Sequence, residues 1–509
     1  MTGSEHTLHA VHIPRPFFES PPASGATRRL LLVSHAFPPD STIGALRWEK
    51  MAAFAAQRGW SLDVLMIDPT QVEVRDDSRL TSLPPGIRLF GVHYYSYRES
   101  SMEAVLRQWA ARVLRPLRSR ESARESTRHQ GKTPPIDAPA PPPASRGNGA
   151  SEQASPGRFV LAVRRAQLAR RSYAEWEDWA ERATVMGIAL AEERPYEVIV
   201  SSGPPHMSHE AARQISQATN TPYVIDLRDP WAHDEYQELD LQSPAWSRLS
   251  AHYEAKAVAG ASLIVMNTEL AAQMMRDQYP KAAEHIITVM NGADPELRLP
   301  GTWGSTFVIS YAGQIYGGRD PRALFRGVGR AIHEVGIAPG ELEVRFMGSD
   351  KIGSTPLTVS ATESGLNGYF VSEPAQVRSA ALALLQRSAM VVILPQKYWY
   401  SIPGKVFEYV QAQAWVLSLA ERESATDLML KDSGADIVAP DDTDGIAQVV
   451  AARYREFRSG VRPKPLNADG RFDRTRQADK LFQSIDRAIE QSTSTSRPRR
   501  FSSMIERLG

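Results

Sequence analysis

The sequence Ser401-Ile-Pro-Gly-Lys-Val-Phe-Glu-Tyr409 predicts a helix that begins at Pro403 and Gly404. Free backbone N–H groups and about half a positive charge make a helix N-terminus a good site for phosphate. Lys405 and Glu408 are three residues apart, so they would share one helix face, with the lysine suited to a diphosphate and the carboxylate to sugar hydroxyls. An ordinary amphipathic helix with a solvated lysine and glutamate is the alternative interpretation.

Strands and helices are expected to alternate on both sides of this stretch. Short apolar runs predict strands at 30–33, 62–67, 87–92, 198–201, 223–226, 263–266 and 286–289, and again at 307–311, 342–346, 390–394, 415–418 and 436–438. Repeated strand-helix alternation is typical of a parallel, doubly wound sheet. The sequence therefore predicts an α/β protein with two Rossmann-like halves that face each other across a cleft.

The domain boundaries follow from composition and periodicity. Residues 119–157 are rich in Pro, Ser, Arg and Gly and nearly free of large apolar residues, so we expect a disordered insertion there. The expected order is a flexible leader (1–27), a first Rossmann-like domain (28–299), a second Rossmann-like domain (300–470), a helix that crosses back to the first domain (471–490) and a flexible tail (491–509).

The overall composition excludes several classes of protein. The 509 residues are 42% hydrophobic and 23% charged, with a net charge of +1 and no cysteine. Disulfides and thiolate metal sites are therefore excluded, and nothing in the charge balance favours nucleic acid as a partner. No run approaches the roughly 20 apolar residues of a membrane span. A cytoplasmic location is expected.

In doubly wound sheets, ligands bind beyond the carboxyl ends of the strands. Gly44 follows the first strand at a helix start, where the absence of a side chain lets backbone approach a ligand, although G-x-G-x-x-G is absent. His206 and His209 share a face of one helical turn, where they could bind a polyhydroxylated ligand or transfer protons. The alternative interpretation is that they are helix-capping or surface residues. No third ligand for a metal is in view. Asp229 precedes a proline and either points into the cleft or ties its loop by an ion pair.

In the second half, a glycine-rich loop follows the strand at 307–311. Gly313 and Gly318 permit close backbone contact, and Arg319 stands at a helix start with a charge suited to phosphate oxygens. Arg319 and Lys405 come from two loops at the same edge of the sheet. Together with the helix start after Pro403, they form a predicted diphosphate clamp.

Six short motifs occur in a characteristic order. They are Phe-Pro-Pro-x(4)-Gly at 37–44, Ser-Gly-Pro-Pro-His at 202–206, Asp-x-Arg-Asp-Pro-Trp at 226–231, Asn-Gly-x-Asp at 291–294, the glycine-rich loop that ends in Arg319, and Lys-Val-Phe-Glu-Tyr at 405–409. Over nearly all of residues 29–490 except the insertion, the chain resembles the retaining family-4 glycosyltransferases, formerly group 1, which have GT-B architecture.

The resemblance implies transfer of a hexosyl or related group from a nucleoside diphosphate sugar to a hydroxyl, with retention and with no required metal or other cofactor. Glu408 would bind the ribose, and Arg319 and Lys405 would take the charge of the diphosphate. Gly44 would approach the phosphates from the other domain. The backbone at 313, 318, 403 and 404 would complete the nucleotide site.

On the acceptor side, the resemblance implies that Asp229, together with either His206 or His209, lines the site of the sugar and the acceptor. At two positions, this sequence lacks a charged residue that many family members have in the nucleotide site. Tyr400 stands where many members have a first glutamate, and Gln314 stands where many have an additional arginine.

The acceptor is expected to be a glycan, a lipid-linked saccharide or a small molecule, as in polysaccharide biosynthesis. The helix expected at 102–118 has apolar residues on one face and arginines around the rest. This pattern is typical of a helix that lies on an anionic membrane surface, and also of an ordinary helix packed on the sheet. Two other hypotheses remain open: an inactive GT-B module that binds a nucleotide sugar or a protein, and a sugar-nucleotide epimerase or hydrolase.

Overall fold

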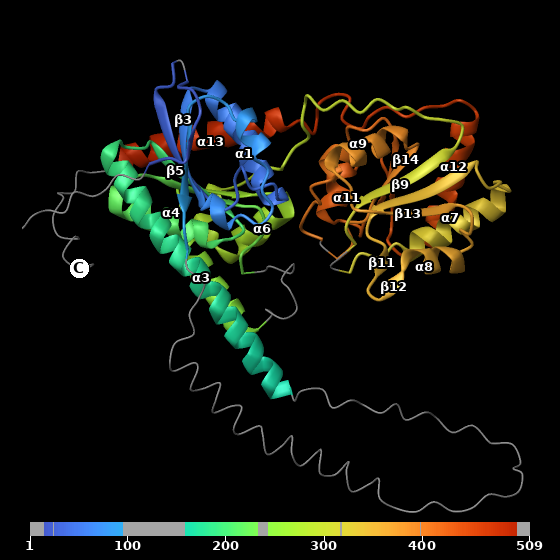
Figure 1. Cartoon of the computed structure of the whole chain (residues 1–509), viewed down its shortest axis with the longest axis horizontal. Coiled ribbons are helices and arrows are strands. Elements are labelled where there is room, and N and C mark those ends of the chain that lie inside the picture. The colour runs from blue at the N-terminus through green and yellow to red at the C-terminus, as the bar shows by residue number, and fades with distance from the viewer. Residues whose placement is uncertain are drawn as a thin grey trace, which may run out of the picture.

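The structure, a computed structural model, describes residues 15–23, 25–94, 158–232, 243–315, 318–397 and 399–495. Two α/β domains lie beside each other (Figure 1). The surface helix expected at 102–118, the insertion expected at 119–157 and the end of the chain beyond residue 495 fall outside the described residues. None of the described helices is long and apolar enough to cross a membrane.

The first domain is built on an eight-stranded sheet, within the described residues, with the order β1-β4-β3-β2-β5-β6-β7-β8. Its strands are β1 (Phe18–Glu19), β2 (Arg28–Ser34), β3 (Trp60–Ile67), β4 (Ile87–Val92), β5 (Val198–Gly203), β6 (Tyr223–Leu227), β7 (Leu263–Met266) and β8 (Ile286–Thr288). All neighbours are parallel except β1 and β4. The strand order reverses between β2 and β5, which makes this pair the switch point of the sheet.

Helices cover both faces of this sheet, because its central strands are apolar on both sides. Leu31 and Val33 of β2 belong to one buried cluster, and Leu30 and Leu32 belong to the other. The helices are α1 (Ile43–Gln57), α3 (Arg158–Glu193), α4 (Met207–Thr219), α5 (Pro244–Ala259) and α6 (Glu269–Gln278), with short 3-10 turns at Pro69–Gln71, Asp77–Ser82 and Pro280–His285. Helices α3 to α6 cover the first face, and α1 lies on the second.

The second domain has a six-stranded parallel sheet, again within the described residues, with the order β13-β10-β9-β14-β15-β16. Its strands are β9 (Phe307–Gly313), β10 (Leu342–Gly348), β13 (Phe370–Pro374), β14 (Met390–Ile393), β15 (Trp415–Leu419) and β16 (Asp436–Val438), and a hairpin of β11 (Lys351–Ile352) and β12 (Thr355–Pro356) lies outside the sheet. The helices are α7 (Arg322–Val335), α8 (Leu357–Glu363), α9 (Arg378–Arg387), α10 (Val406–Tyr409), α11 (Ala425–Leu430) and α12 (Thr443–Arg458).

The two parallel, doubly wound sheets confirm the predicted α/β architecture. Three details differ from expectation. The leader is not wholly flexible, because Phe18 pairs with Leu89 and forms an antiparallel edge strand. Strand β13 was not expected. The helix predicted from Pro403 begins only at Val406 and has four residues, too few for the phosphate-binding N-terminus inferred from the sequence.

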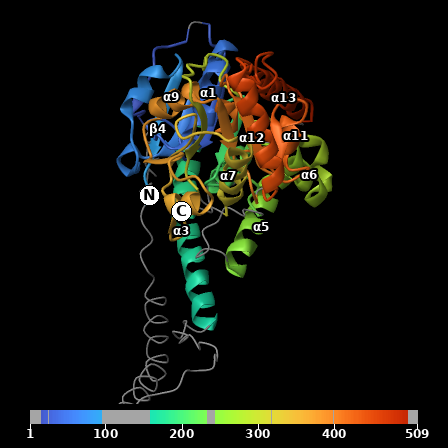
Figure 2. The same cartoon turned by 90° about the vertical axis from the view of Figure 1, so that its right-hand side faces the viewer.

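The last helix, α13 (Arg474–Thr495), returns to the first domain (Figures 1 and 2). Leu481, Phe482 and Ile485 of α13 are buried in the same cluster as Trp48 of α1. The two connections between the domains run side by side. The amide of Ala293 donates to the Phe472 carbonyl at 2.7 Å, and the amide of Arg474 donates to the Ala293 carbonyl at 2.7 Å.

Candidate functional site

The switch points of the two sheets face each other and carry most of the expected site residues. In the first domain, Gly44 follows β2 and His206 follows β5. In the second, Arg319 follows β9 and Lys405 follows β14, which are neighbours in the sheet. Parallel strands end at one edge, so loops far apart in the sequence meet there. Two cavities lie at this meeting point.

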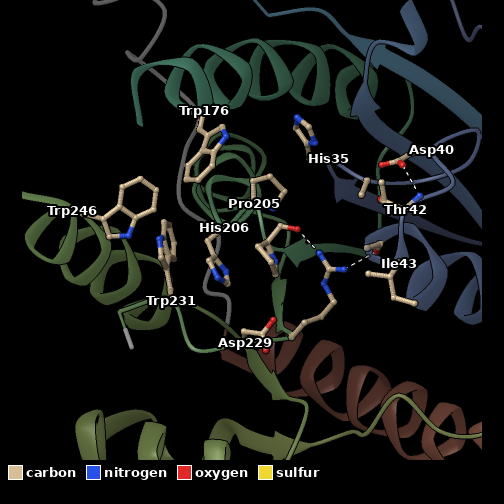
Figure 3. A pocket seen from close by; sticks show the side chains of 14 residues that line it. His35, Asp40, Thr42, Ile43, Trp176, Pro205, His206, Asp229, Trp231 and Trp246 are labelled. Atoms are coloured by element: carbon tan, nitrogen blue, oxygen red, sulfur yellow. Dashed lines mark hydrogen bonds between the residues drawn. The ribbon is translucent and has the colours of Figure 1, made fainter. Parts of the chain in front are cut away.

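The first cavity, which we call the aromatic cavity, has a volume of about 420 Å³ and lies within the first domain. Trp176 of α3, Trp231 after β6 and Trp246 of α5 line one side, and Asp40 and Thr42 line the other (Figure 3). A volume of this size falls within the usual range for small-molecule sites, about 300–1,000 Å³.

His206 lines the aromatic cavity, whereas His209 is fully buried behind it. Burial lowers the pKa of His209 to about 3 and that of His206 well below its usual value, so both rings are neutral. Ser201 Oγ lies 3.2 Å from the Val224 carbonyl and 2.8 Å from His209 Nδ1; when the hydroxyl donates to the carbonyl, Ser201 Oγ accepts from His209 Nδ1.

That placement of the Ser201 proton sets the other proton positions along the chain of groups. With its proton on Nδ1, His209 has an unprotonated Nε2. This atom lies 3.5 Å from His206 Nδ1 and accepts a hydrogen bond from it. His206 Nε2 then carries a lone pair, and this buried atom has no hydrogen-bond partner among the described residues. The arrangement suits His206 to accept a hydrogen bond from a hydroxyl.

Arg228 holds the loops around the aromatic cavity together. Its Nε donates to the Gly203 carbonyl at 2.9 Å, its Nη1 donates to the Gly44 carbonyl at 2.7 Å, and its Nη2 donates to the Pro204 carbonyl. Gly203 is needed here because a Cβ would lie 2.6 Å from the ring of His209. Arg228 therefore ties the loop after β6 to the loops after β5 and β2 through backbone carbonyls.

The second cavity, which we call the interdomain cavity, has a volume of about 280 Å³ and is lined by both domains. Ile43, Arg228 and Asp229 line both cavities, so the two share a wall. Burial raises the pKa of Asp229, and the neighbouring Arg228 charge opposes that rise. The shared position of Asp229 is consistent with its predicted orientation toward the cleft.

The wall of the interdomain cavity has more cations than carboxylates, although the charge of Arg47 is paired with the buried Asp226. Among the described residues, its wall has one carboxylate, that of Asp229, and four arginines, which are Arg47, Arg228, Arg319 and Arg474. Arg474 donates to the carbonyls of Asn291 and Gly292, both at 2.9 Å. Such a concentration of guanidinium groups favours an anionic ligand, and the fork of an arginine suits phosphate oxygens.

Lys405 lies beneath the glycine-rich loop. Its Nζ donates to the Ala312 carbonyl at 2.9 Å and to Tyr311 Oη at 3.1 Å. Burial lowers the pKa of Lys405 to about 7, and repulsion from Arg319 adds to this effect. Gly313, at φ +140°, makes room for the ammonium group, because a Cβ there would lie 1.9 Å from Nζ.

The other expected nucleotide-site residues separate into two groups. Pro403 and Gly404 line the interdomain cavity. Gly318, at φ +84°, instead accommodates the side chain of Lys397, which a Cβ would meet at 2.5 Å. Glu408 is held by a different partner from Lys405, because its Oε1 accepts from Arg378 Nε at 2.9 Å and Nη2 at 2.7 Å.

Tyr400, which replaces the expected glutamate, is an interdomain packing residue. Its side chain is 1% exposed and belongs to the apolar cluster of the first domain. Its carbonyl accepts a hydrogen bond from Thr268 Oγ1. The sequence does not indicate this role or those of Trp176 and Trp246. For Arg228, its position between Asp226 and Asp229 was an available signal.

Comparison with known proteins shows the fold. No family model matches the chain, and no curated protein matches it in sequence. Similar solved structures include sucrose-phosphate synthase from Thermosynechococcus elongatus, with 12% identity and a TM-score of 0.52 over 91% of this chain and 100% of that chain. Another is α,α-trehalose 6-phosphate synthase from Burkholderia multivorans, with 13% identity and a TM-score of 0.51 over 93% and 100%.

A third is the UDP-forming α,α-trehalose-phosphate synthase from Burkholderia xenovorans, with 11% identity and a TM-score of 0.51 over 91% of this chain and 99% of that chain. These structures are two-domain glycosyltransferases of GT-B architecture. The chain thus has the GT-B fold, with two Rossmann-like domains across a cleft.

Proposed function

We propose that this protein is a retaining glycosyltransferase that moves a sugar from a nucleoside diphosphate sugar to a hydroxyl acceptor. The observation that supports this most directly is the pairing of two unlike cavities in one cleft. The interdomain cavity carries four arginines, and the aromatic cavity shares the wall of Ile43, Arg228 and Asp229 with it. A diphosphate in the first and an acceptor in the second would meet at that wall.

On the donor side, Arg319 and Lys405 stabilise the diphosphate, and the backbone at Pro403 and Gly404 lies against it. Glu408 remains the proposed ribose contact. Because Arg378 occupies Oε1, that contact uses Oε2. Fixed cations of this kind act most strongly in a site that excludes water, where little screening opposes them.

On the acceptor side, His206 Nε2 accepts a hydrogen bond from the reacting hydroxyl and orients its oxygen toward the anomeric carbon. The bond from that carbon to the diphosphate oxygen breaks, and the bond to the acceptor oxygen forms on the same face. The acceptor proton passes to the departing phosphate oxygen, so the products are a glycoside and a nucleoside diphosphate. Asp229 lies at the shared wall, beside the transferred sugar.

Nucleoside diphosphates are expected to raise the melting temperature. A ligand at 100 times its dissociation constant stabilises the folded state by about 2.7 kcal/mol. A thermal-shift screen with UDP, GDP, ADP and dTDP measures this, with the matching nucleosides as controls that lack the diphosphate. Failure of all four diphosphates to shift the transition would contradict the proposal. Hydrolysis of a nucleotide sugar without transfer to any acceptor would instead favour a hydrolase.

The affinity for a nucleotide sugar is expected to fall as the pH rises above about 7. Lys405, whose pKa burial lowers to about 7, is mostly protonated at pH 6 and mostly neutral at pH 8. A diphosphate favours the protonated form, so loss of the proton weakens binding roughly tenfold between pH 6 and pH 8. Calorimetric titration with a nucleotide sugar, whose phosphates do not titrate in this range, measures the slope.

Two variants test the assignment of that slope. Lys405→Met is expected to bind weakly with no dependence between pH 6 and pH 8. Lys397→Met removes a lysine whose side chain packs against Gly318 and is expected to keep the slope. An unchanged slope in Lys405→Met would refute the role given to this lysine.

A further inference from the structure

The walls of the aromatic cavity differ in how much ring surface they offer. Trp231 stacks on His206, with ring centroids 5.3 Å apart and an interplanar angle of 22°, and on Tyr253, at 6.1 Å and 7°. Its faces are therefore engaged within the protein. Trp176 and Trp246 instead meet at a steep angle of 76° with centroids 5.4 Å apart. Trp176 is half-buried, so its indole supplies ring surface to the cavity.

Polar groups occupy the opposite side (Figure 3). Asp40 Oδ1 accepts from the Thr42 amide at 2.8 Å, which fixes this carboxylate at the wall. Asp229 and His206 line the same space from the strand ends. The cavity thus combines an apolar aromatic wall with a rim of hydrogen-bond acceptors.

The charge of this cavity is opposite to that of its neighbour. Among the described lining residues, the carboxylates of Asp40 and Asp229 outnumber the single cation, Arg228. Three N–H groups of Arg228 are already donated to backbone carbonyls. The two histidines add no charge, because burial lowers the pKa of His35 to about 4 and that of His206 well below its usual value. An anionic ligand is therefore disfavoured here.

We propose that the aromatic cavity binds the acceptor as an uncharged saccharide, with one sugar ring stacked on Trp176 and its hydroxyls directed at Asp40, Asp229 and His206. This inference rests on the proposed glycosyl transfer and names its acceptor class. A pyranose has an apolar face of C–H groups and a rim of hydroxyl donors, which matches the two walls. A purely apolar ligand would leave both carboxylates desolvated without donors. A sugar phosphate or uronic acid would bring an anion against them.

Saturation-transfer NMR on the full chain, in the presence and absence of UDP, tests the ligand class. Methyl α-D-glucopyranoside, N-acetylglucosamine and maltose represent uncharged saccharides, glucose 6-phosphate and glucuronate represent anionic ones, and phenol represents an aromatic group without a sugar. We expect at least one uncharged saccharide to bind more than tenfold tighter than each anionic probe and than phenol. Equal or tighter binding of an anionic probe or of phenol overturns the inference.

Variants at Trp176 test the stacking. Trp176→Leu keeps an apolar side chain but removes the ring, and it is expected to raise the acceptor KM about tenfold while the donor KM stays within threefold. Trp176→Phe restores a ring and is expected to stay within threefold on both. Trp399→Leu, at a position 44% exposed and outside both cavities, is the matched control and is expected to change neither.

An unchanged acceptor KM in Trp176→Leu overturns the stacking, and an equal rise in both KM values assigns Trp176 a structural role only, which overturns it as well. Failure of this inference is distinguishable from failure of the proposed function. The nucleoside diphosphate screen reports on the interdomain cavity, whereas saccharide binding without nucleotide reports on the aromatic cavity alone.

Discussion

Replacing Arg319 by alanine is expected to lower kcat for sugar transfer about 10²–10³-fold, the usual cost of removing one preorganised donor from a site where charge develops. The side chain of Arg319 is 5% exposed and lies in the wall of the interdomain cavity. In the proposed reaction, negative charge grows on the departing diphosphate. A buried guanidinium near that charge stabilises the transition state more than the ground state. Initial rates at saturating nucleotide sugar and acceptor measure the effect.

The matched control for this variant is Arg322→Ala. Arg322 begins α7 three residues later, but its side chain is 57% exposed and pairs with Asp320. Its removal is expected to leave kcat within about twofold of the wild-type value. Arg319→Lys keeps the charge but loses the planar fork, so it should recover only part of the rate. A kcat for Arg319→Ala within threefold of wild type would refute the proposed role.

The second large effect is expected on stability, from Asp226→Ala. Asp226 is 1% exposed and accepts from Arg47 Nε at 2.8 Å, Arg47 Nη2 at 3.0 Å and Trp48 Nε1 at 2.8 Å. Its loss leaves the buried charge of Arg47 without its carboxylate. Breaking a buried pair in this way costs about 3–5 kcal/mol of unfolding free energy. Urea unfolding of the first domain, fitted separately from the second, measures the loss.

An exposed pair provides the control for Asp226. Asp178→Ala removes a carboxylate that pairs with Arg182 one turn away on α3, where both side chains contact solvent. Its expected effect on the free energy of unfolding is within about 0.5 kcal/mol. Asp226→Asn keeps an acceptor for Arg47 but loses the charge, and should fall between the two alanine variants. Equal stability of Asp226→Ala and Asp178→Ala would contradict the account of the buried pair.

The sheets could be predicted from the sequence because strands buried on both faces are continuous apolar runs. Leu30-Leu-Leu-Val33 is such a run, and its residues alternate between the two clusters of the first domain. Strand β13, Phe370–Pro374, gives no such signal. It contains a serine and a glutamate, ends in proline and pairs on one side only, with β10. An edge strand needs no apolar run, so composition alone does not distinguish it from a loop.

The candidate site was predictable only where the strands themselves fix it. His206, Asp229 and Arg319 follow strand ends, and the topology of a doubly wound sheet brings such positions together. Trp176 and Trp246 come from helices, and the rotation of each helix about its axis depends on packing against distant residues. No local pattern distinguishes a tryptophan that faces a cavity from one in the core.

Lys405 and Glu408 show how tertiary contacts replace a local pairing. Their spacing predicts one helix face, but α10 has only four residues, with Lys405 at its N-cap. Lys405 contacts Tyr311 of strand β9, and Glu408 contacts Arg378 of α9. Both partners lie more than one element away in the sequence, so spacing within the stretch could not reveal them.

The crossing of the chain beside Ala293 has a consequence for motion between the domains. Everything from Asp294 to Phe472 leaves and re-enters the first domain at one place, where the two backbones are hydrogen-bonded to each other. The second domain is therefore topologically an inserted cassette, and this crossing is its single covalent pivot. Rotation about that pivot changes the separation of Arg319 from Arg228 and Asp229, and it also moves Tyr400 relative to the first-domain cluster in which it is buried. Bound diphosphate, which contacts both sides in the proposed complex, would hold the cassette in its closed orientation.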